Sequence, residues 1–165
     1  MSELHSQIVT SYNTAFQQWN RLRGSALDAA NHVASELCTR LGVPGSWRLA
    51  RIERANDEAY AKNGEIAVSY EGVARFCIEA EFLMDRYDRE RACTAKIDLR
   101  MRATAVGDGS YKWKLLWVTS TASGPHNEEF DIHAPAAMDV AAKDTAKRII
   151  EYFARKARDD AWKDR

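Results

Sequence analysis

One apolar stripe at helical spacing runs through the N-terminal quarter of this chain. At 100° per residue its members stay within a sector about 120° wide, and the sector does not drift along the segment. The stripe consists of Leu4, Ile8, Tyr12, Ala15, Phe16, Trp19, Leu22, Ala26, Ala29, Ala30, Val33, Leu37 and Leu41. We therefore predict one amphipathic helix from about residue 3 to residue 41, with Ser2 as its N-cap. Gly42 and Pro44 are expected to end it.

The length of this helix constrains what the chain can do. A helix of about 38 residues is roughly 57 Å long, whereas a compact domain of 165 residues is about 40 Å across. The helix should therefore extend beyond its own domain by about 15 Å, unless it breaks near Gly24. An apolar stripe that extends into solvent needs a partner.

The polar face of the same helix carries few charges. Residues 1–46 include only six charged side chains: Glu3, Arg21, Arg23, Asp28, Glu36 and Arg40. A neutral polar face tolerates burial against another protein better than a charged one does. Two interpretations remain open, a long core helix with a solvated face, and a helix that dimerises through Ile8, Tyr12, Phe16 and Trp19. We expect the second, and with it a homodimer.

The periodicity changes to two between about residues 65 and 121. Apolar residues alternate with polar ones over 66–70, 76–84, 93–103 and 113–117, as in an antiparallel sheet with one face on a core. A three-residue loop at 107–109 keeps that face continuous, because it sets Ala103 opposite Trp113, Met101 opposite Leu115 and Leu99 opposite Trp117. The same argument predicts a loop at 71–73 with Val68 opposite Phe76, and a charged hairpin tip at 85–91.

The remaining segments are less regular. Residues 47–54 fit a first strand or a short helix, of which we favour the strand. Residues 56–64 read as a loop and 120–127 as a turn-rich connection, with a short edge strand at Phe130 and Ile132 as an option. Pro135 opens a C-terminal helix.

The order of elements predicts one α+β domain. It comprises a long helix over 1–42, an antiparallel meander of about five strands within 47–133, and a second helix over 135–160. Both helices are expected on one face of the sheet.

Composition narrows the functional classes. Lysine plus arginine equals aspartate plus glutamate, 24 each, which disfavours binding to nucleic acid by bulk charge. No run of about 18 apolar residues predicts a membrane span, and the N-terminus lacks the pattern of a secretory signal. Cys38, Cys77 and Cys93 form no CxxC pair, so we expect free thiols, no zinc site and a cytoplasmic protein.

No motif of a known enzyme class is present. Glu129, Asp131 and His133 would share one side of an extended strand and could approach a metal ion, but we favour an ordinary edge loop, because any polar loop with two histidines has this pattern. Glu79 and Glu81 are expected to form cross-strand ion pairs. We predict no catalytic residue, no metal ligand and no cofactor.

The outer face of the sheet, away from the core, is the most suggestive surface. It combines cationic and apolar side chains, and Arg102 lies opposite Lys114, a like-charge pair that is unfavourable by itself. Such a mixture is typical of binding surfaces. The candidate partner-binding residues are Arg75, Arg100, Arg102, Lys112, Lys114, Leu116 and Val118.

Three functions fit these observations. The first is a non-enzymatic protein-binding module, such as an inhibitor, an immunity protein or a chaperone-like protein that occludes a surface of an unidentified protein partner. The second is a small-molecule-binding protein or enzyme with a cavity between sheet and helix, lined by Phe76, Phe82, Trp113 and Trp117. The third is nucleic-acid binding through Arg100, Arg102, Lys112 and Lys114, which lacks an evident platform for base stacking. We favour the first.

Overall fold

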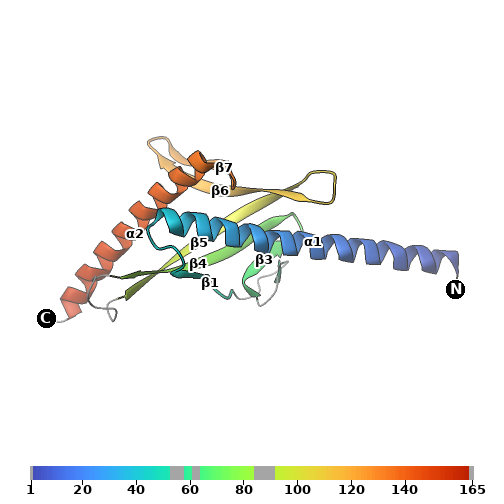
Figure 1. Cartoon of the computed structure of the whole chain (residues 1–165), viewed down its shortest axis with the longest axis horizontal. Coiled ribbons are helices and arrows are strands. Elements are labelled where there is room, and N and C mark those ends of the chain that lie inside the picture. Colours follow the sequence, from blue (N-terminus) through green and yellow to red (C-terminus); the bar gives the residue numbers. More distant parts are fainter. Residues whose placement is uncertain (1, 53–57, 61–63, 84–91, 164–165) are drawn as a thin grey trace.

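The computed structural model describes residues 2–52, 58–60, 64–83 and 92–163. In this part of the chain two helices, α1 and α2, lie on one face of an antiparallel sheet (Figure 1). The protein is therefore of the α+β class, in agreement with the pattern of the sequence. The predicted hairpin tip at 85–91 lies outside the described residues.

Helix α1 spans Glu3–Arg40 without interruption. The Ser2 hydroxyl accepts a hydrogen bond from the backbone N–H of His5 at 3.3 Å, as expected of an N-cap. Gly42 follows the last turn with a φ of +79°, the left-handed conformation that ends many helices. The helix continues through Gly24, so its full length is retained.

Among the described residues, seven strands form the sheet, in the order β2-β3-β4-β5-β6-β7, with β1 paired to β4 outside this path. Strand β4 is long enough for β3 to pair with one part of its edge and β1 with another. The strands are β1 Trp47–Leu49, β2 Glu58–Tyr60, β3 Ile66–Ser69, β4 Val73–Leu83, β5 Ala92–Ala105, β6 Tyr111–Thr121 and β7 Gly124–Asp131. All pairings are antiparallel.

The predicted register of the β5–β6 hairpin is confirmed at its closed end. Ala103 lies opposite Trp113 and Met101 opposite Leu115. The N–H of Val106 donates to the carbonyl of Ser110 at 3.2 Å, which closes the three-residue loop 107–109. This loop keeps the apolar side chains of both strands on the core face.

The register predicted for β3 and β4 is wrong by two residues. Val68 lies opposite Ala74, and Phe76 lies opposite Ile66. The loop has three residues, as predicted, but it occupies 70–72, because Gly72 provides the positive φ of +77° that its last position requires. A shift of two residues leaves the same side chains on the core face.

Two segments that we predicted as loops contain strands. Strand β2 lies within the predicted loop 56–64, and β7 begins at Gly124 within the predicted connection 120–127. Thr121 pairs with Gly124, so only Ala122 and Ser123 connect β6 to β7. The side chains of β7 are mostly exposed or half-buried, and such a strand needs no alternation of apolar residues.

One hydrophobic core holds these elements together. It joins the C-terminal half of α1, the inner face of the sheet and the first turns of α2, which spans Pro135–Lys163. The two helices are linked by an ion pair of 2.7 Å between Arg40 and Asp139. No helix in the described ranges is both long and apolar enough to cross a membrane.

Candidate functional site

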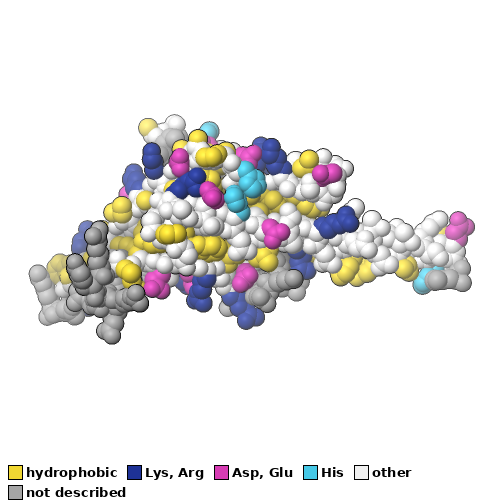
Figure 2. All heavy atoms as spheres, in the orientation of Figure 1, with side chains coloured by type: hydrophobic (Ala, Val, Ile, Leu, Met, Phe, Trp, Pro, Cys, Tyr) yellow, Lys and Arg dark blue, Asp and Glu magenta, His cyan; other side chains and the backbone are white. Residues whose placement is uncertain are grey.

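The first candidate surface is the N-terminal part of α1, residues 3–18, which we call the projecting half. It extends away from the sheet, with the N-terminus at its far end (Figure 1). Leu4, Ile8, Tyr12 and Phe16 are 70%, 69%, 67% and 53% exposed. Figure 2 shows hydrophobic side chains along one edge of this segment and few charged groups on it. The predicted extension of the helix beyond its domain is therefore present.

Trp19 marks the point at which α1 leaves the domain. Its ring stacks on that of Tyr70, with 5.1 Å between centroids, and it is half-buried against the core. Part of its surface is thus used within the chain, unlike that of the other three predicted dimerisation residues. Tyr12 and Phe16 stack on each other, with 6.2 Å between ring centroids.

The projecting half is poorly suited to stand alone as a helix. An isolated helix of this length is marginal in water even with alanine-rich sequence. Here most residues have low helix propensity, since they are β-branched, aromatic or short and polar. A partner that buries the apolar stripe would supply the missing stabilisation.

The predicted partner-binding residues lie on strands β4, β5 and β6, and the register aligns them across neighbouring strands. Arg75 lies opposite Arg100, and Arg102 lies opposite Lys114. Leu116 lies opposite Arg100, and Val118 is two residues further along β6.

Strand β7 neutralises part of this cationic surface. Arg102 donates to Glu129 at 2.7 Å, and the Lys112 ammonium lies 3.6 Å from Asp131. From the sequence these two carboxylates are expected in an edge loop, and their ion pairs with Arg102 and Lys112 are not predicted. Arg102 and Lys112 thus have acidic partners within the chain.

The hairpin of β5 and β6 opens beyond the pair formed by Arg100 and Leu116. The predicted pairing of Leu99 with Trp117 is absent from the ladder. Instead, the indole N–H of Trp117 donates to the carboxylate of Asp144 on α2 at 2.8 Å. This contact joins β6 to the helix at the point where β6 leaves β5.

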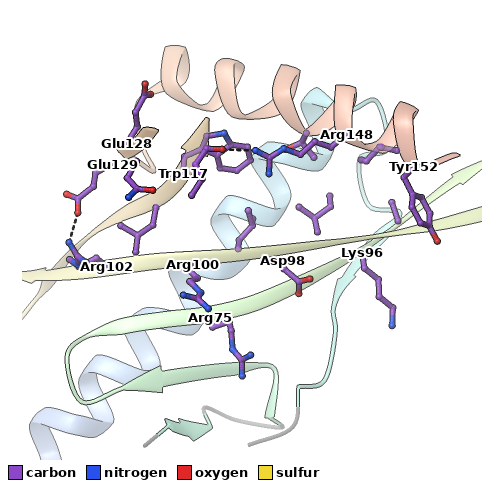
Figure 3. A pocket seen from close by; sticks show the side chains of 18 of the residues that line it. Arg75, Lys96, Asp98, Arg100, Arg102, Trp117, Glu128, Glu129, Arg148 and Tyr152 are labelled. Atoms are coloured by element: carbon purple, nitrogen blue, oxygen red, sulfur yellow. Dashed lines mark hydrogen bonds and ion pairs between the residues drawn. The ribbon is translucent and has the colours of Figure 1, made fainter. Parts of the chain in front are cut away.

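The opening forms a cavity that we call the wedge. It lies between residues 94–99 of β5 and residues 116–118 of β6. Helix α2, at the top of Figure 3, forms the third side, which we call the floor of the wedge. Its lining is Arg75, Thr94, Ala95, Lys96, Ile97, Asp98, Leu99, Arg100, Arg102, Leu116, Trp117, Val118, Asn127, Glu128, Glu129, Thr145, Arg148, Ile149 and Tyr152. The volume of about 1210 Å³ exceeds the range of about 300–1,000 Å³ that is typical of small-ligand sites.

Arg148 organises one side of the wedge. Its guanidinium donates to the backbone carbonyl of Val118 at 2.7 Å and pairs with Asp144 at 2.8 Å. It also lies over the ring of Trp117, 5.2 Å from the centroid. A side chain of α2 therefore satisfies a backbone carbonyl at this edge of β6. The spacing of residues in the sequence does not predict this contact, because β6 and α2 are far apart along the chain.

The acidic and histidine residues singled out in the sequence serve structural contacts. Asp131 accepts a hydrogen bond from the backbone N–H of His133, which lowers the pKa of that carboxyl. The ring of His133 packs on that of His32, 4.5 Å apart. Glu79 pairs with Arg48 at 2.6 Å and lies 3.8 Å from Lys96. Within the described residues no group of three potential ligands is arranged to hold a metal ion.

The aromatic residues predicted to line a cavity belong mainly to the core. Phe76 and Trp113 are buried, and the indole N–H of Trp113 donates to the Ser25 hydroxyl at 2.8 Å. Phe82 packs edge-on against Phe153. Of the four, only Trp117 lines the wedge.

The two surfaces differ in character. The projecting half is nearly uncharged and carries one apolar stripe, whereas the wedge combines a strand edge, side chains of α2 and several cations. Comparisons of the chain with models of protein families, with curated proteins and with solved structures find no match for it.

Proposed function

We propose that this chain is a non-enzymatic protein-binding module that forms a homodimer through the projecting half of α1. The observation that carries the proposal is the exposure of Leu4, Ile8, Tyr12 and Phe16 on a helix that leaves its own domain. Exposed apolar patches of this kind are typical of interaction sites.

A second copy of the chain is the partner that fits this helix best. Ile8, Tyr12, Ala15 and Trp19 are spaced by four, three and four residues, the spacing of a seam between two helices. The projecting half carries one charged residue, Glu3 near its tip, so two copies would meet without like-charge repulsion along the stripe. The contact would use the same surface of both subunits, as two-fold dimers do.

The module would act by covering a surface of another protein, as an inhibitor, an immunity protein or a chaperone-like protein does. Pairing through the projecting half leaves the wedge and the outer sheet face of each copy open to that protein. A protein partner is favoured over nucleic acid, because Glu129 and Asp131 already neutralise Arg102 and Lys112. Phosphate contacts would need those cations unpaired.

The dimer is tested by replacing Tyr12 and Phe16 together with serine. Light scattering at tens of micromolar should give twice the monomer mass for the wild type and the monomer mass for this double variant. Circular dichroism should show the sheet intact, because both side chains lie outside the core. A matched control replaces Asn13 and Gln17 with serine, both outside the apolar stripe, and should remain dimeric. A monomeric wild type at that concentration refutes the dimer.

A further inference from the structure

Strand β5 has an unpaired stretch in the middle of the sheet. Ala103 donates its N–H to the carbonyl of Gly72, on the β4 side, at 2.9 Å. Backbone groups of successive strand residues point to opposite sides, and the β4–β5 register has no bulge, so Ala95, Ile97 and Leu99 also point to β4. The residues between them direct their backbone groups into the wedge, where no described strand pairs with them. These residues are Thr94, Lys96 and Asp98.

A strand placed in the wedge would have α2 beneath it. Ile149 is half-buried and Tyr152 is exposed, and both reach into the wedge from the helix. Thr145 is 3% exposed, and its hydroxyl has no hydrogen-bond partner among the described residues. A buried hydroxyl without a partner is costly. Side chains on the inner side of an added strand would meet this floor and that hydroxyl.

The charges around the wedge favour an acidic occupant. Five basic and three acidic side chains line it. Arg102 and Arg148 have their own carboxylates, at 2.7 and 2.8 Å. The Lys96 ammonium is 3.8 Å from the carboxylate of Glu79, a long distance for an ion pair. The same carboxylate makes a closer contact, of 2.6 Å, with Arg48. Arg100 is exposed and lies opposite another arginine, Arg75.

We propose that the wedge binds an extended segment of a partner protein, which adds a strand antiparallel to β5. Residues opposite Thr94, Lys96 and Asp98 would hydrogen-bond to β5, and those beside Lys96 and Arg100 would direct acidic side chains to the outer face. The alternate residues would be apolar and pack on α2. Strand addition of this kind takes affinity from backbone bonds and specificity from alternate side chains. The inference rests on the proposed protein-binding function, since it names the chemistry of the partner, but it does not require the dimer.

The hydrogen bond from Arg148 to the carbonyl of Val118 determines which backbone amides of the bound segment are expected to contribute to binding. Because Arg148 already donates to that carbonyl, amides of the added strand need not reach it, and we assign the pairing of the added strand to β5. Only every second amide of the segment, those of its acidic residues, is therefore needed. Binding through charge alone would not distinguish the two sets of amides.

The probe is an acetylated and amidated heptapeptide of alternating glutamate and valine, added to the full chain. Isothermal titration calorimetry should show saturable binding. N-methylation of the glutamates should weaken it by about tenfold or more, whereas N-methylation of the valines should change it by less than about twofold. Hydrogen exchange should slow at the amides of Thr94, Lys96 and Asp98 and stay unchanged at Ala95 and Ile97.

Charge-reversed variants provide the matched test. Lys96→Glu with Arg100→Glu should weaken peptide binding by about tenfold or more. Lys143→Glu with Lys147→Glu makes the same change of charge on exposed positions of α2 outside the wedge and should leave binding unchanged. Equal binding of both methylated peptides, or displacement of the peptide by a single-stranded oligonucleotide, overturns the proposal.

The same titration separates this inference from the dimer. In the monomeric Tyr12 and Phe16 double variant the peptide should bind as in the wild type. If the wild type is dimeric but does not bind the peptide, the wedge proposal is overturned and the dimer is not. A monomeric wild type that binds the peptide overturns the dimer alone.

Discussion

The two halves of α1 have the same apolar period but opposite surroundings. From Leu22 to Cys38 the stripe lies in the core, whereas from Leu4 to Phe16 it is exposed. The halves also differ in the size of their apolar residues. The buried half relies on alanine at 26, 29, 30 and 34, and the projecting half on leucine, isoleucine, tyrosine and phenylalanine.

This difference indicates that each half is fitted to a different neighbour. Small residues let α1 approach its own sheet closely, while Val33 and Leu37 fill the space that remains. The large side chains of the projecting half do not reach that sheet, so they do not contribute to its packing. They are the kind of residues that dominate protein interfaces. The comparison therefore supports an interface on the projecting half.

The largest contrast is expected from one substitution made in each half. Leu37→Ala opens a cavity at a fully buried position and should lower the free energy of unfolding by about 2–5 kcal/mol. Leu4→Ala should change it by less than about 0.5 kcal/mol. Both are measured by urea unfolding in the monomeric double variant, so that pairing does not contribute. Similar losses at the two positions would contradict the division of the helix.

The boundary between the halves should show an intermediate effect. Trp19 and Tyr70 stack at 5.1 Å, and aromatic pairs contribute about 0.5–1.5 kcal/mol beyond their burial. A double-mutant cycle of Trp19→Ala and Tyr70→Ala should return a coupling energy in that range. A coupling near zero would place the boundary further toward the C-terminus.

The smallest change in stability is expected at Gly24, where the helix continues without a break. Gly24 lies in mid-helix, and a Cβ added there meets no atom within 4 Å, so Gly24→Ala should stabilise the chain by about 0.5–1 kcal/mol. Gly42→Ala is the matched control, because its φ of +79° disfavours a side chain and should cost about 1 kcal/mol. Thermal unfolding measures both. Destabilisation by Gly24→Ala would indicate a functional bend at that residue.

The elements that sequence predicted correctly carry strong local signals. The first helix has a periodic stripe with a serine cap and a glycine end, and the loop 107–109 is fixed by two glycines together with a continuous apolar face. Strand β7 has neither kind of signal. Its sequence, Gly-Pro-His-Asn-Glu-Glu-Phe-Asp, does not alternate, because its stability comes from backbone pairing with β6.

The candidate site could be predicted only in part. Five of the seven predicted partner-binding residues line the wedge, namely Arg75, Arg100, Arg102, Leu116 and Val118, whereas Lys112 and Lys114 do not. The wedge begins where the β5–β6 ladder ends at Arg100 and Leu116, and next to it Trp117 and Asp144 on α2 are joined by a hydrogen bond. Neither strand periodicity nor loop length contains that long-range contact. Lys96, Thr145 and Arg148 were missed for the same reason.

The central claim is that a second copy covers the projecting half of α1. Hydrogen exchange of the amides from residue 7 to residue 18, measured at several chain concentrations, tests it most directly. We expect slow exchange at high concentration and fast exchange on dilution, because the segment has too little helix propensity to stay folded without its partner. The Tyr12 and Phe16 double variant should exchange fast at every concentration. Exchange in the wild type that does not depend on concentration would contradict the claim.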